Sequence, residues 1–106
     1  MQYLKVGTED RFRSPEPAVL SVLGRKIRIW LDDDGVWQAM EMICRHQNSD
    51  LSQGERDGDI VTCPRHGWRY DLASGECLTE GWASLRRYEV KVEGGEVFVS
   101  ASPRAD

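Results

Sequence analysis

Two short segments, each with one cysteine and one histidine, constrain this 106-residue chain more than any other feature. The first reads C-x-H at Cys44 and His46, the second reads C-x-x-H at Cys63 and His66, and 16 residues separate His46 from Cys63. Together they hold two of the three cysteines and both histidines of the chain. Thiolates and neutral imidazoles bind soft and borderline metals, so we expect the fold to bring the two segments together around a metal centre.

A zinc ion and an iron–sulfur cluster are the two centres that use these ligands. Zinc sites usually place both cysteines in one segment and both histidines in another. Here each segment has one of each, as at Cys44 and His46. That arrangement suits a two-iron cluster in which the cysteines hold one iron and the histidines hold the other, with two bridging sulfides. A structural zinc site remains the alternative.

The residues that flank the two segments are similar to those of a known family. Leu51, the DGDIVTCP lead-in, the HGWRYD segment and the SGEC turn resemble the low-potential Rieske ferredoxins and the Rieske domains of bacterial ring-hydroxylating oxygenases. The resemblance implies one Rieske domain over 1–106, with a two-loop cluster-binding subdomain at about 43–83. It also implies a Rieske 2Fe–2S cluster with four ligands: Cys44, His46, Cys63 and His66.

Departures from the high-potential members of the family predict a low reduction potential. Those members have an extra cysteine in each loop, forming a disulfide, at the positions of Ser49 and Arg65 here. They also have a serine that bonds a bridging sulfide, where this chain has Trp68, whereas their tyrosine is matched by Tyr70. One hydrogen-bond donor to the cluster is therefore expected to survive, and two features that raise the potential are missing.

Short apolar alternations and turn residues predict an all-β fold, an antiparallel sandwich or partly open barrel. We expect strands at 3–6, 18–23, 27–31, 36–43, 60–62, 70–72, 76–78, 85–93 and 96–100, and one helical turn at 8–12. Gly94-Gly95 predicts a two-residue hairpin turn, and the acidic run 32–34 before Gly35 predicts a solvated turn. Trp30, Trp37 and Trp82 are expected to pack in the core or in hairpins.

The charge and composition of the chain argue against some classes of binding partner. A formal net charge of −4 argues against nucleic acid or an anionic membrane as the partner. The N-terminal residues include no apolar stretch of membrane length, so we expect a soluble, cytoplasmic protein. Arg45 and Arg65 would belong to a mildly basic collar around the cluster, either as solvated surface or as docking contacts. Cys77, the third cysteine, is expected to be a small buried residue with no chemistry.

The function that the resemblance implies is one-electron transfer. The chain would take electrons from a flavoprotein reductase and pass them to a terminal oxygenase or another redox enzyme. It is not expected to be an enzyme itself, because a Rieske oxygenase also needs a mononuclear iron held by two histidines and a carboxylate. The only two histidines, His46 and His66, are already assigned to the cluster. The alternatives are the small subunit of a nitrite reductase-like complex and a zinc-bound structural module.

Overall fold

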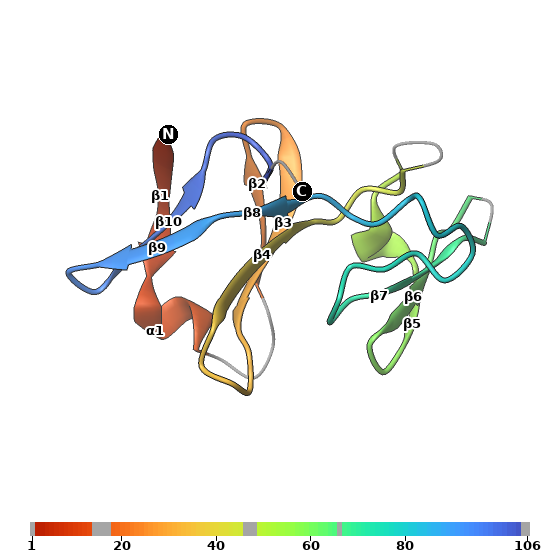
Figure 1. Cartoon of the computed structure of the whole chain (residues 1–106), viewed down its shortest axis with the longest axis horizontal. Coiled ribbons are helices and arrows are strands. Elements are labelled where there is room, and N and C mark those ends of the chain that lie inside the picture. The colour runs from red at the N-terminus through yellow and green to blue at the C-terminus, as the bar shows by residue number, and fades with distance from the viewer. Residues whose placement is uncertain (1, 14–17, 46–48, 66, 105–106) are drawn as a thin grey trace. The chain divides into compact units, whose positions relative to one another are not determined.

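The computed structural model describes residues 2–13, 18–45, 49–65 and 67–104 (Figure 1). The chain divides into two compact units, one formed by Met1–Glu41 with Arg87–Asp106 and the other by Met42–Arg86. Both are built from antiparallel strands with very little helix, which confirms the predicted all-β class. Within the described ranges, no helix is long and apolar enough to cross a membrane.

The first unit consists of two antiparallel sheets that do not close into a barrel. One has the order β1-β10-β9 and the other the order β2-β3-β4-β8. A single helical turn, α1 (Glu9–Phe12), follows β1, as predicted. The strands are β1 (Tyr3–Thr8), β2 (Ala18–Val22), β3 (Arg25–Leu31), β4 (Trp37–Glu41), β8 (Arg87–Tyr88), β9 (Val90–Glu93) and β10 (Glu96–Ser100).

Turn chemistry fixes the register of these strands. Gly94 and Gly95 both have positive φ, at 60° and 80°, so they form the predicted two-residue turn that pairs Glu93 with Glu96. In the turn before β4, the carboxylate of Asp32 accepts hydrogen bonds from the backbone N–H groups of Asp34 and Val36. The acidic run is therefore a turn, as predicted.

An apolar cluster fills the interior of the first unit, because β3, β4, β8 and β10 place large side chains there. Its fully buried members are Phe12, Ile27, Ile29, Ala39, Tyr88, Val97 and Val99. One polar network lies beside it. The Tyr88 hydroxyl donates to Glu41 at 2.6 Å and accepts from the Arg25 guanidinium at 2.8 Å, which satisfies the buried carboxylate of Glu41.

The second unit contains a smaller sheet with the order β5-β6-β7 and one 3₁₀ turn. Its elements are η1 (Leu51–Gln53), β5 (Glu55–Asp57), β6 (Ile60–Thr62) and β7 (Arg69–Asp71). Gly54 lets η1 run directly into β5, because a Cβ at this position would lie 2.1 Å from the Thr62 carbonyl oxygen. Neither η1 nor β5 was predicted from the sequence.

Three details differ from the prediction. The expected strand 85–93 is two strands, β8 and β9, which belong to different sheets and are separated at Glu89. The expected strand 76–78 is reduced to one bridge between Cys77 and Tyr70. The prediction for Trp82 was wrong, since this side chain is 65% exposed, whereas Trp30 and Trp37 are partly buried.

Candidate metal centre

The two cysteine-containing loops of the second unit are closed in the same way. In the first cysteine loop (Cys44–Ser49), the backbone N–H of Cys44 donates to the Ser49 carbonyl at 2.9 Å. In the second cysteine loop (Cys63–Trp68), the N–H of Cys63 donates to the Trp68 carbonyl at 2.7 Å. Each loop therefore spans six residues between a cysteine N–H and the carbonyl five positions later.

The residues before and inside the loops explain these closures. Ile43 forms a bridge pair with Asp50, so the two ends of the first loop are held side by side. The second loop follows β6 directly, and its Gly67 has φ 75° and donates its N–H to the Cys63 carbonyl at 3.1 Å. Glycine adopts such a φ without a steric penalty, so Gly67 lets this loop turn tightly.

Both cysteines point into the second unit. The Cys44 and Cys63 side chains are 1% and 2% exposed, and neither forms a disulfide. Ser49 and Arg65 stand where the family resemblance would place the two disulfide cysteines of high-potential members. The chain therefore presents two buried thiols at the first positions of two similar loops, which is what a cluster iron with two sulfur ligands requires.

Tyr70 connects the two loops. It lies on β7 and pairs with Val61 of β6, the strand that leads into the second loop. Its hydroxyl lies 3.4 Å from Cys44 Sγ and accepts the backbone N–H of Arg45 at 3.0 Å. Because the oxygen already accepts from Arg45, the hydroxyl proton is available for Cys44 once that thiol is ionised. Burial, reinforced by the contact with Cys44, raises the pKa of Tyr70, so the phenol keeps this proton.

Cys77 has a structural role in the same unit. It is 2% exposed, as predicted, and its Sγ accepts the backbone N–H of Glu80 at 3.3 Å. The segment that follows reaches both cysteine loops. The Ser84 carbonyl accepts a hydrogen bond from the Arg45 guanidinium at 2.8 Å, and the Trp82 ring packs edge-on against Trp68 with 6.0 Å between centroids.

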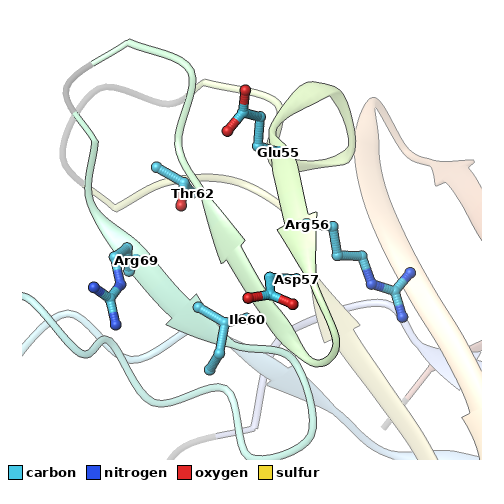
Figure 2. Close-up of a pocket in the computed structure, with 6 residues that line it drawn as sticks. All are labelled: Glu55, Arg56, Asp57, Ile60, Thr62 and Arg69. Carbon is cyan, nitrogen blue, oxygen red and sulfur yellow. The ribbon is translucent and has the colours of Figure 1, made fainter.

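A separate pocket lies on the small sheet, and neither thiol lines it. It has a volume of about 320 Å³, and Figure 2 shows that its side chains come from all three strands. Cross-strand pairing aligns Glu55 with Thr62 and Thr62 with Arg69. The pocket is open and its charged side chains are solvated, so we assign it no part in metal binding. It is lined by Glu55, Arg56, Asp57, Ile60, Thr62 and Arg69.

Two of the four predicted ligands, His46 and His66, lie outside the described residues. Among the residues that are described, no group of three or more metal-binding side chains converges. The other two predicted ligands, Cys44 and Cys63, fit a 2Fe–2S cluster. They are soft donors, they are buried, and one of them has a hydroxyl donor beside its sulfur.

Comparison with known proteins agrees with this geometry. Residues 2–89 match the Rieske [2Fe-2S] domain. The oxygenase component of 3-ketosteroid-9-alpha-monooxygenase from Rhodococcus rhodochrous is 29% identical over 95% of this chain, but the chain spans only 28% of that relative. Similar proportions hold for the relative from Mycolicibacterium smegmatis, which is 32% identical over 89% of the chain and 26% of its own length.

Solved structures that this chain covers over nearly their whole length include chains from carbazole 1,9a-dioxygenase and, as a likeness of fold at 20% identity, a putative nitrite reductase small subunit. The ferredoxin of carbazole 1,9a-dioxygenase from Nocardioides aromaticivorans IC177 superposes with a TM-score of 0.68 at 25% identity, covering 96% of this chain and all of that one. A chain in the complex of reduced oxygenase and oxidized ferredoxin of carbazole 1,9a-dioxygenase gives 0.70 at 26% identity, covering 98% and 97%. The fold, the two buried thiols and the match over residues 2–89 show that this chain belongs to the Rieske [2Fe-2S] domain family.

Proposed function

We propose that the chain is a one-electron carrier with a low-potential Rieske 2Fe–2S cluster, taking electrons from a flavoprotein reductase and passing them to a terminal oxygenase. The observation that carries the proposal is the pair of buried thiols, Cys44 and Cys63, at equivalent positions of two loops joined by Tyr70. The proposed ligands are Cys44, His46, Cys63 and His66, and the proposed cluster-binding subdomain, about 43–83, falls within the unit Met42–Arg86.

When bound, the cluster supplies a site that gains and loses one electron. Two neutral imidazoles in place of two thiolates change the formal charge of the oxidised centre from −2 to zero, which raises its potential above that of four-cysteine clusters. Within the Rieske range, this chain keeps the hydroxyl of Tyr70 but has Trp68 in place of the serine. We therefore place the potential near the low end of that range, at about −150 mV.

Two observations support a carrier. The two histidines of these 106 residues, His46 and His66, are both proposed cluster ligands, so the sequence supplies no histidine for a further mononuclear iron. The chain also matches the ferredoxin of carbazole 1,9a-dioxygenase over 96% of its own length and all of that ferredoxin. A cytoplasmic location remains a prediction from the sequence.

The proposal is tested by the metal content of the purified protein. We expect two irons and two acid-labile sulfides per chain, with a rhombic paramagnetic signal that appears only after reduction. The reduced protein should then return to the oxidised spectrum when mixed with a terminal oxygenase. One zinc per chain without sulfide would overturn the proposal in favour of a structural module.

A further inference from the structure

Trp82 is the most exposed tryptophan of the described chain, with 65% of its surface open to solvent. Tryptophan has a large apolar surface and is enriched at protein interfaces. Here it lies against a ligand loop, because its ring packs edge-on against Trp68, the residue that closes the second cysteine loop. The exposed ring is therefore next to the proposed redox centre.

The segment that carries Trp82 is held rigidly on both sides. Before it, the backbone N–H of Glu80 donates to Cys77 Sγ, and after it Ala83 is fully buried and donates its N–H to the Glu80 carbonyl at 3.1 Å. The next residue, Ser84, receives the Arg45 guanidinium. A side chain that is ordered before binding loses little conformational entropy in a complex, so Trp82 is suited to act as an anchor.

The two cysteine loops beside this anchor carry a charge opposite to that of the whole chain. The first and second cysteine loops contain Arg45 and Arg65 and no carboxylate, a net of +2, while the chain carries −4, so the remaining residues carry −6. Arg45 contacts the carbonyl of Ser84, two residues after Trp82, while Glu80 lies two residues before it and is the one carboxylate within three residues of Trp82 in the sequence. A positive edge around an aromatic anchor matches an acidic partner, because complementary charge steers association.

Building on the proposed function, we infer that Trp82, Trp68 and the two loop arginines form the surface that binds the terminal oxygenase. The oxygenase would receive Trp82 in an apolar recess with acidic residues around it. Tryptophan and arginine are the residues most often found at the energetic centre of interfaces, which agrees with this composition. An electron that leaves here crosses the second cysteine loop, since Trp68 belongs to that loop and contacts Trp82.

The charge of the surface is tested with two small oxidants that each remove one electron from the reduced protein. Hexacyanoferrate(III) is a trianion and hexaammineruthenium(III) is a trication. If electrons leave through the positive surface, added salt should slow oxidation by the anion and speed oxidation by the cation. The reverse salt dependence, which the net charge of −4 would produce at a uniform surface, overturns the inference.

The anchor is tested with the oxygenase components of carbazole 1,9a-dioxygenase and 3-ketosteroid-9-alpha-monooxygenase as acceptors. Trp82→Ala should lower the second-order rate constant of electron transfer by about tenfold or more, and Trp82→Phe by less. Leu23→Ala is the matched control, because Leu23 is 66% exposed in the first unit and should leave the rate unchanged. In all three variants the reduction potential should be unchanged. The rate constant for oxidation by hexacyanoferrate(III) should stay within twofold of wild type.

Failure of the surface and failure of the function give different results. If the wild type reduces an oxygenase and Trp82→Ala does so at the same rate, the surface is wrong and the carrier function stands. If the reduced wild type transfers electrons to the small oxidants but to neither oxygenase, the proposed acceptor is wrong, and the inference that rests on it falls too.

Discussion

The two units of this chain fill their interiors by different means. The first has seven strands, and aliphatic and aromatic side chains make up its core. The second has three strands of three residues each, and three of its ten buried apolar side chains in the described residues are cysteines. The ten are Met42, Cys44, Leu51, Val61, Cys63, Tyr70, Leu72, Cys77, Ala83 and Leu85.

This difference shows which unit depends on a bound group. A segment as short as Met42–Arg86 buries too little apolar surface to be stable alone, and small folds of this kind usually rely on disulfides or metals. None of its three cysteines forms a disulfide. We therefore expect the cluster to stabilise the second unit by cross-linking its two loops, while the first unit is stable through apolar packing.

The largest effect should come from removing a cysteine ligand. Cys63→Ala is expected to abolish iron and sulfide binding and to unfold the second unit, because both loops lose their cross-link. Hydrogen exchange should then show lost protection in β6 and β7 and retained protection in β3 and β10. Cys77→Ala is the control, which should keep the full cluster because that thiol only packs and accepts one N–H. Slow hydrogen exchange in β6 without the cluster would contradict the expectation that the second unit depends on the cluster for its stability.

A cavity made in the core of the first unit should have the opposite effect: the fold loses stability and the cluster is retained. Ile29 is fully buried in the apolar cluster, so Ile29→Ala is expected to lower the free energy of unfolding by about 2–5 kcal/mol. The visible spectrum of the cluster should be unchanged in the absence of denaturant. Urea unfolding followed by far-ultraviolet circular dichroism measures the loss, and exposed Leu23→Ala should change it by less than about 0.5 kcal/mol.

The sequence was sufficient where a local pattern decides the structure. Alternating apolar residues located most strands of the first unit, and Gly94-Gly95 located its tightest turn. It was insufficient for β5, whose residues Glu55, Arg56 and Asp57 are all charged and exposed. That segment becomes a strand only because β6 pairs with it, which is a tertiary effect that no propensity encodes.

At the candidate site, too, local sequence patterns predicted some features and missed those that depend on tertiary contacts. Motif spacing identified the two thiols, and the family resemblance identified Tyr70 as a neighbour of a cysteine sulfur. The contacts of Arg45 with Ser84 and of Trp68 with Trp82 were not predicted, because they join residues far apart in sequence. Trp82 was expected to pack in the core or in a hairpin, as tryptophan usually does. Its exposure depends on where the segment after Cys77 is fixed, and that is decided by buried Ala83 and Leu85.

A smaller effect is expected at the polar network of the first unit. Tyr88→Phe removes the hydrogen bond to buried Glu41, which should cost about 1 kcal/mol of unfolding free energy near neutral pH. Burial, followed by the bond to Glu41, raises the pKa of Tyr88, so the folded state favours the neutral phenol. The contribution is thus complete below the ordinary tyrosine pKa of about 10 and is lost as the pH rises through the folded-state value.

Urea unfolding at pH 8 and at about pH 10.5 measures this dependence. Wild type should lose stability between the two, and Tyr88→Phe should lose less, because one of the two tyrosines with a raised pKa is gone. Tyr70 in the second unit, whose pKa is also raised, contributes to the decline that remains. Equal losses in wild type and variant would show that the Tyr88 phenol does not titrate with unfolding.

The smallest effect should be a change of reduction potential at Tyr70. Tyr70→Phe removes the hydroxyl that can donate to Cys44 Sγ, and a donor to sulfur stabilises the more negative, reduced state. We expect the potential to fall by a few tens of millivolts, roughly half a kcal/mol at 59 mV per tenfold. Trp68→Ser should raise it, because it offers a hydroxyl and admits water. Film voltammetry of both variants at one pH decides the matter. If Tyr70→Phe leaves the potential unchanged, the hydroxyl serves only the backbone N–H of Arg45, and the link between the loops is structural rather than electronic.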